Sequence, residues 1–311
     1  MSINTQLMNF ALKLINIFFP KLAYSMLKKR LLMPESESNE WTDDIKKIVI
    51  ETKFGNVNTY QYGQGKCVWL LHGWSNAYQF WPLMKKLANQ GYSCIAIEIP
   101  PHNKLNNSNI SLPKWVNAFD SAVKNIHEPV HVITQGLGAS VIANSSWFTG
   151  YQYDLTLISP VLNYLTSLKR YVKTNTIPSS LLSRLVNEIY STDKIHLKDL
   201  DATATINEFS GRLSIFYSKL DDFTSLNAIS VIAKNDDRKV VHFKGATIQK
   251  LLTVNQLFTL FMGKKDLSIL LFKIPSYILS QVDTFNVNQL RYLKRENILL
   301  CKSIVCFSVF L

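Results

Sequence analysis

The sequence has few cysteines, no long hydrophobic run and a deficit of acidic residues, and each shortage narrows the possible classes of protein. No run of about 18 uncharged apolar residues occurs, so no transmembrane helix is predicted. Four cysteines in 311 residues do not supply a disulfide framework or a cluster of metal ligands, so we expect no metal and no other cofactor. With 47% apolar and 18% charged residues, the chain is expected to form one large globular domain with additional segments.

Lysine and arginine outnumber the acidic residues by 34 to 22, which gives a net charge of +12. These basic residues are spread along the chain without a zinc-finger, RNA-recognition or helix-turn-helix signature. A nucleic-acid partner is therefore not expected, and the charge favours an anionic membrane surface as a partner.

The N-terminal segment is apolar and aromatic and ends in the basic cluster of Lys28, Lys29 and Arg30. A secretory signal peptide has the opposite order, with its positive charges before the apolar stretch. We expect residues 5 to 31 to form one or two helices with a broad apolar face and an exposed basic cluster. Two interpretations are open. The protein is cytoplasmic and this segment is an amphipathic helix that binds the inner face of the membrane, or the segment is a helix packed on the domain's own surface.

Strand-like and helix-like segments alternate from about residue 46 onward. The expected strands include KCVWLLHG, SCIAIEIP, PVHVIT, YDLTLISP, RLSIFYS and RKVVHF, and the expected helices include AYQFWPLMKKLANQG, LPKWVNAFDSAVKNI and GASVIANSSWF. This alternation predicts an α/β fold with a mostly parallel central sheet flanked by helices. Residues 161–208 have no strand pattern and predict a helical cap. The expected organisation is an N-terminal helical segment over 1–45, an α/β domain over 46–263 and a C-terminal extension over 264–311.

Five short turns follow the expected strands in an order that resembles the α/β-hydrolase fold, and in particular bacterial serine esterases and lipases. They are His72-Gly73-Trp74, Pro100-Pro101-His102, TQGLGA at 134–139, SKLDDFTS after RLSIFYS, and KGATIQ after RKVVHF. The resemblance covers residues 46 to 263 and implies a carboxylic ester or acyl hydrolase whose catalytic groups lie on these turns.

Transferred residue by residue, the resemblance places Gly136 at the nucleophile position and Ile248 at the base position, while Asp221 keeps the acid. The oxyanion-hole N–H groups are assigned to Trp74 and Leu137. A serine at this apex adopts a strained positive φ that glycine adopts at no cost, so glycine removes the nucleophile and relieves strain. The triad is therefore expected to be degenerate.

Other serines are poor replacements for the nucleophile. Ser140 lies about one turn into the helix that follows the apex, Ser145 and Ser146 lie further along, and Ser75 has no base beside it. The favoured interpretation is a catalytically silent protein that retains at most the binding of a small acyl or hydrophobic ligand. Two alternatives remain open: an active hydrolase that uses Asp221 with a partner from the cap, and a decaying gene product whose C-terminal extension is read from an altered frame.

Overall fold

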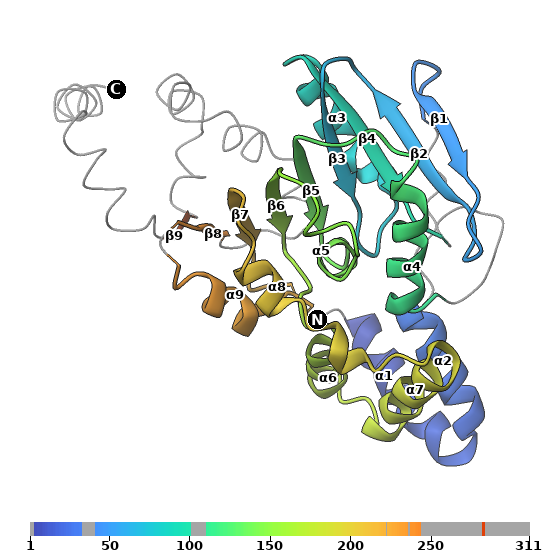
Figure 1. Cartoon of the computed structure of the whole chain (residues 1–311). Helices are drawn as coiled ribbons and strands as arrows, with labels where there is room; N and C mark the ends of the chain where they lie inside the picture. The colour runs from blue at the N-terminus through green and yellow to red at the C-terminus, as the bar shows by residue number, and fades with distance from the viewer. Residues whose placement is uncertain are drawn as a thin grey trace, which may run out of the picture.

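The computed structural model describes residues 3–32, 41–100, 110–221, 223–235, 237–243 and 282–283, and it is organised around a single twisted sheet (Figure 1). The strands are β1 (Lys46–Ile50), β2 (Val57–Tyr62), β3 (Lys66–Leu71), β4 (Tyr92–Glu98), β5 (His131–Gln135), β6 (Asp154–Ile158), β7 (Leu213–Tyr217), β8 (Lys239–Phe243) and β9 (Val282–Asp283). Within the described residues the strand order is β1-β2-β4-β3-β5-β6-β7-β8-β9. The six strands from β3 to β8 pair in parallel, whereas β1, β2 and β9 pair antiparallel at the edges. The predicted mostly parallel α/β sheet is confirmed.

The central strand β3 shows why the sheet is buried on both faces. Val68 and Leu70 point to one face and Trp69 and Leu71 to the other, and all four side chains are buried. Figure 1 shows helices beside the sheet. The helices are α1 (Ile3–Phe18), α2 (Pro20–Leu32), η1 (Ala77–Phe80), α3 (Trp81–Ala88), α4 (Leu112–Val123), α5 (Gly138–Ala143), α6 (Tyr164–Thr174), α7 (Ser179–Asp193), η2 (Leu197–Leu200), α8 (Thr203–Asn207) and α9 (Leu226–Ile232). Residues from α4, α5 and α9 belong to the same core cluster as Trp69, and residues from α3 belong to the same core cluster as Leu70. A continuous apolar run is the pattern expected for such a strand.

The helical cap is also confirmed, since α6, α7, η2 and α8 occupy the connection between β6 and β7. At the start of α6 the Asn163 side chain accepts a hydrogen bond from the Thr166 backbone N–H at 2.9 Å, which satisfies one of the unpaired groups at the helix terminus. Figure 1 shows α6 and α7 beside α1 and α2 at one end of the molecule.

The helix predicted over GASVIANSSWF is shorter than expected, because α5 ends at Ala143. The Asn144 side chain donates hydrogen bonds to Ser140 O at 2.9 Å and to Leu200 O at 3.3 Å. Asparagine and serine side chains of this kind compete with the helical ladder for backbone carbonyls, which ends the helix there.

The second N-terminal helix is an integral part of the fold. Its side chains Ala23, Leu27 and Leu31 are buried in the main core. The Tyr24 hydroxyl donates a hydrogen bond to Glu188 of α7 at 2.5 Å, and Lys28 forms an ion pair with the same carboxylate. These hydrogen bonds, from Lys28 first and then Tyr24, hold the pKa of the Glu188 carboxyl below its usual range.

The expectation of a fully exposed basic cluster is wrong for two of its three members. Lys28 is half-buried against Glu188, and Arg30 is half-buried with its guanidinium 5.3 Å from the centre of the Tyr171 ring. Lys29 alone of the three is exposed. Three consecutive residues of a helix point in different directions, so they cannot all face solvent when one face of the helix is buried. Lys28 and Arg30 instead contact Glu188 and Tyr171 of the cap. Among the described helices, none is long and apolar enough to cross a membrane.

The packing of α2 predicts a strong contrast between two adjacent residues. Leu27→Ala should lower the free energy of unfolding by about 2–5 kcal/mol, because Leu27 is completely buried. Met26→Ala, on the exposed side of the same turn, should cost no more than about 1 kcal/mol. Urea unfolding followed by circular dichroism measures both values. Equal costs for the two variants would contradict the described packing of α2.

Candidate functional site

The apex between β5 and α5 is a glycine in the left-handed region. Gly136 has a φ of +53°, and it is the first residue after β5. A Cβ atom built on Gly136 would lie 3.7 Å from the Cα of Gly73, which is an ordinary van der Waals contact. The apex therefore has room for a side chain, and only the positive φ disfavours one.

The turn after β3 has no such room. A Cβ atom on Gly73 would lie 2.7 Å from Gln135 O, 2.8 Å from Gln135 Oε1 and 3.0 Å from Leu137 N. The two turns, one from β3 and one from β5, thus touch backbone to backbone. Glycine is required at 73 because any side chain would separate them.

A glutamine side chain completes the contact between these turns. Gln135 Oε1 accepts hydrogen bonds from the Gly73 backbone N–H at 2.9 Å and from Gln79 Nε2 at 3.1 Å. Ser75 donates to Gln79 Oε1 at 2.6 Å, which extends the chain of polar contacts. From the sequence, Gln135 was identified only as part of the turn TQGLGA at 134–139, with no role of its own. The role of Gln135 depends on its burial between the two turns and on its hydrogen bond with the Gly73 backbone N–H. No local sequence pattern indicates either of these.

His72 holds the first turn in place and does not act as a base at the cavity. Its Nε2 accepts a hydrogen bond from the Ile99 backbone N–H at 3.1 Å, so Nδ1 carries the ring proton, and Nδ1 lies 2.9 Å from Gly73 O. The ring is completely buried. Both ring nitrogens are therefore committed to the backbone of neighbouring loops.

The two turns open onto a cavity of about 390 Å³ beneath the cap. Trp74, Gly136, Leu137 and Asp221, which the sequence placed at one site, all line this cavity. The remaining lining residues are Arg30, Leu31, Gln135, Val161, Tyr164, Tyr171 and Phe223. Burial raises the pKa of the Tyr164 hydroxyl, so this residue is neutral. Ile248, the predicted base position, lies outside the described residues.

The carboxylate of Asp221 is hydrogen-bonded within its own turn. Oδ1 accepts from the Phe223 backbone N–H at 3.0 Å, and Oδ2 accepts from the Thr224 hydroxyl at 2.8 Å. Arg170 of α6 donates to Thr224 O at 2.6 Å and ties the same turn to the cap. These hydrogen bonds hold the loop that follows β7.

The other serines considered as nucleophiles are directed elsewhere. The Ser140 hydroxyl is buried and donates to Val161 O, and the Ser145 hydroxyl donates to Ile142 O at 2.7 Å. Among the described residues that line the cavity there is no serine, cysteine or histidine. In the described part of the chain no group of three metal-binding side chains occurs either.

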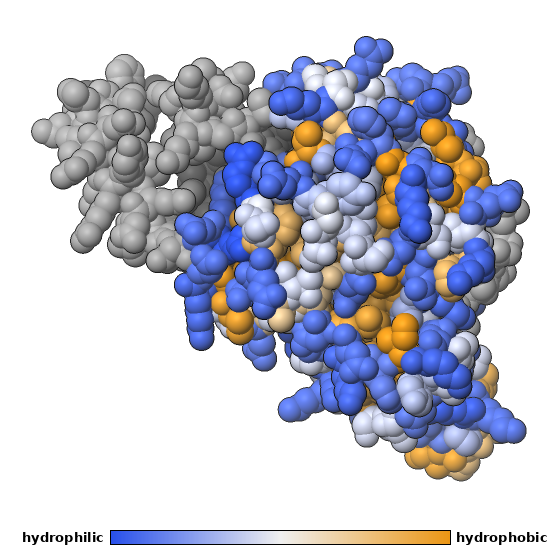
Figure 2. All heavy atoms as spheres, viewed as in Figure 1, coloured by the Kyte–Doolittle hydropathy of each residue, from blue (hydrophilic) through white to orange (hydrophobic). Residues whose placement is uncertain are grey.

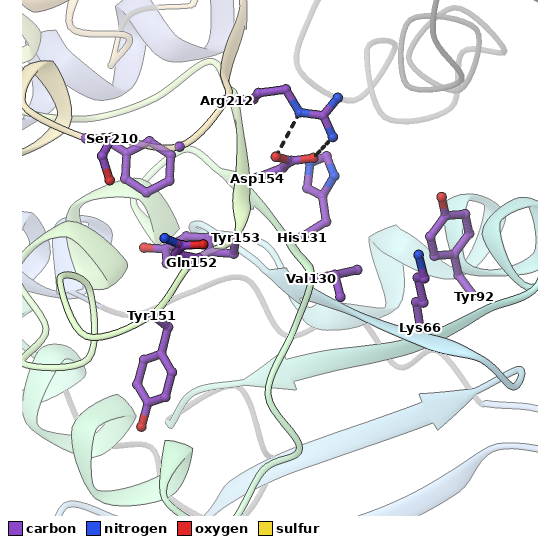
Figure 3. Close-up of a pocket in the computed structure, with 12 residues that line it drawn as sticks. Lys66, Tyr92, Val130, His131, Tyr151, Gln152, Tyr153, Asp154, Ser210 and Arg212 are labelled. Atoms are coloured by element: carbon purple, nitrogen blue, oxygen red, sulfur yellow. Dashed lines mark hydrogen bonds and ion pairs between the residues drawn. The ribbon is translucent and has the colours of Figure 1, made fainter.

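A larger cavity, of about 630 Å³, lies at the opposite ends of the strands (Figure 3). It is lined by Lys66, His131 and Asp154, the first residues of β3, β5 and β6, and by Arg212 just before β7. Figure 3 shows the Arg212 guanidinium facing the Asp154 carboxylate, and Nε donates to Oδ1 at 3.0 Å. In open parallel sheets ligands bind outside the carboxyl ends of the strands, whereas this cavity lies at the amino ends. Because its central charges also pair with each other, we assign the functional site to the smaller cavity.

Comparisons with known proteins support the fold. No protein-family model and no curated protein sequence matches the chain. The Pyrococcus furiosus esterase PF2001 aligns with a TM-score of 0.53 and 15% identity over 72% of this chain and 91% of its own. Thermogutta terrifontis esterase 2 aligns with a TM-score of 0.51 and 14% identity over 73% and 98% of the two chains. The N-acyl homoserine lactonase AidH gives a TM-score of 0.51 and 14% identity over 75% and 98%.

The chain therefore has the α/β-hydrolase fold, as its turns predicted. At 14–15% identity these neighbours establish the fold alone.

The amino-end cavity predicts a specific pH dependence of stability. Burial, opposed by the charge of Asp154, lowers the pKa of His131 from 6.5 to about 4. Between these values the unfolded chain binds a proton at His131 that the folded protein does not, so stability decreases as the pH falls from 6.5 toward 4. The expected slope from this one group is about 1.4 kcal/mol for each pH unit, with no contribution above pH 7.

Urea unfolding across this pH range measures the slope, and His131→Gln should reduce it while leaving the pH dependence above 7 unchanged. An unchanged slope in the variant would show that His131 does not stay neutral in the folded protein.

Proposed function

We propose that this chain is a catalytically silent protein of the α/β-hydrolase fold that binds a small acyl ligand in the cavity beneath its cap. The observation that carries the proposal is the apex itself. Gly136 stands at the nucleophile position with a φ of +53°, and no described lining residue is a serine, cysteine or histidine. Acyl transfer through a covalent intermediate needs a nucleophile and a base to activate it.

The lining of the cavity favours an apolar ligand with one polar group. Leu31, Leu137, Val161 and Phe223 supply apolar surface, and its volume of about 390 Å³ falls within the range typical of small-molecule sites. The backbone N–H groups assigned to the oxyanion hole belong to Trp74 and Leu137, and both residues line the cavity. Hydrogen-bond donors of this kind stabilise a carbonyl oxygen as well as an oxyanion.

Charge in the cavity is nearly balanced, which favours a carbonyl compound over a strong anion. Arg30 is the one cation among the described lining residues, and Asp221 is the one carboxylate. The Asp221 oxygens accept hydrogen bonds from Phe223 and Thr224, so this carboxylate is held in its own turn. The alternative of an active hydrolase built on Asp221 is less favoured, because a catalytic acid in this fold orients a histidine and no described residue that lines the cavity is a histidine.

The silent site predicts that the protein hydrolyses p-nitrophenyl esters no faster than its Asp221→Asn variant. Gly136→Ser should fold, at a cost of about 1 kcal/mol from the positive φ, and should still not turn over, because a lone serine lacks a base. The double change Gly136→Ser with Ile248→His restores the chain order serine, aspartate and histidine, and it should gain weak activity. Esterase activity in the unmodified protein that Asp221→Asn abolishes would refute the silent-site proposal.

Because Trp74 is the one tryptophan among the described lining residues, adding a short-chain fatty-acid ester is predicted to quench part of the total fluorescence of the six tryptophans. Val161→Phe places a larger side chain in the cavity and should weaken binding about tenfold or more. Val231→Phe makes the same substitution on the exposed face of α9 and serves as the matched control. Binding that is the same in all three proteins would place the ligand elsewhere. Failure of the unmodified protein both to bind and to unfold cooperatively would favour a decaying gene product.

A further inference from the structure

The first two helices expose an apolar surface where they meet. Six large side chains form it, and we call this set the apolar elbow: Phe10, Leu14, Ile17, Phe18, Phe19 and Leu22. Phe18 is 72% exposed and Ile17 is 69% exposed. A group of large apolar side chains with such exposed fractions indicates an interaction surface. Figure 2 shows hydrophobic surface at the lower tip of the molecule, where Figure 1 places these helices.

The elbow cannot be an unused core face, because both helices already bury a different face. Leu12 of α1 and Ala23 and Leu27 of α2 are buried in the main core. Phe10, Leu14 and Ile17 follow each other at helical spacing on the other side of α1. The helices are thus apolar on two sides, one for the domain and one directed outward.

The charges that the two helices of the elbow themselves carry are all positive. Lys13, Lys21 and Lys29 are exposed, and Lys13 lies on the same stripe of α1 as Phe10 and Ile17. Residues 1 to 34 contain no aspartate or glutamate. Lysine stems of this kind lie along an apolar surface while their ammonium groups reach a polar boundary. The rim is therefore complementary to an anionic partner.

The lengths of the two helices favour a position on the surface of a bilayer over one that crosses it. With 16 and 13 residues, α1 and α2 are each too short to span a bilayer. Their break at Phe19 and Pro20 makes the elbow a protruding corner of apolar side chains. A protruding apolar corner rimmed by lysines is the combination that interfacial helices use on anionic lipid.

We propose that the apolar elbow docks on the surface of an anionic phospholipid bilayer, with its apolar side chains among the acyl chains and Lys13, Lys21 and Lys29 at the headgroups. This inference goes beyond the proposed function and does not depend on it, because the elbow lies outside the cavity. Each large side chain buried in the acyl region contributes about tenfold or more to partitioning. Each lysine near an anionic surface contributes on the order of fivefold.

Co-sedimentation of the full chain with vesicles of phosphatidylcholine, with and without phosphatidylserine, tests the proposal. Deleting the N-terminus would be ambiguous, since α2 supplies core residues, so the variants are point changes on the exposed face. Ile17→Ser with Phe18→Ser should weaken binding to the anionic vesicles by about 100-fold. The control, Val49→Ser with Val231→Ser, removes one exposed side chain from β1 and one from α9, and should bind as the unmodified protein does.

Charge is tested separately by Lys13→Gln with Lys21→Gln. This variant should bind the phosphatidylserine vesicles about 25-fold more weakly and should bind pure phosphatidylcholine as the unmodified protein does. The proposal is overturned if the unmodified protein does not sediment with anionic vesicles, or if the elbow and control variants bind alike. It is equally overturned if the elbow instead mediates a dimer that Ile17→Ser with Phe18→Ser dissociates. A failure of ligand binding in the cavity leaves these outcomes unchanged, so the two proposals fail separately.

Discussion

The backbone contact between the turn after β3 and the turn after β5 is the constraint around which the site is built. A side chain at Gly73 would collide with Gln135, so the two strand ends can meet only through glycine. Their approach brings Trp74 and Leu137 to one cavity, and between the two strand ends the chain adopts the left-handed region at Gly136. Parallel strands β3 and β5 pair directly, with Leu71 opposite Thr134, and this register fixes which residues of the two turns face each other.

This constraint is independent of catalysis. An enzyme of this fold places a strained residue at the apex and supports it with the surrounding structure, whereas glycine adopts the same conformation without strain. The contacts of Gln135 with Gly73 and Gln79 then hold the turn without a reactive group. The loop after β7 is likewise held by Asp221, which bonds to Phe223 and Thr224. Each turn is stabilised by its own hydrogen bonds, so the framework would keep its shape in a protein without catalytic activity.

Local patterns were sufficient to predict the sheet, the cap and the turns, because each depends on residues close together in the chain. The apolar run of β3 and the glycine of the apex are examples. The contacts that join α2 to the cap depend on residues far apart, and no local pattern indicated them. Arg30 reaches Tyr171, and Tyr24 and Lys28 share Glu188, across separations of more than a hundred residues. The basic cluster was therefore expected to be exposed, although its inner members have partners on the cap. The role of Ile248 lies beyond the described residues and stays a prediction.

Helix α2 belongs to two environments at once. Arg30 and Leu31, near the C-terminal end of α2, line the cavity. Leu22, near the N-terminal end of the same helix, is exposed in the apolar elbow. A single stretch of 13 residues cannot move at one end without moving at the other. The proposed ligand site and the proposed membrane contact therefore share one helix as their support, and any influence of one on the affinity of the other would be reciprocal.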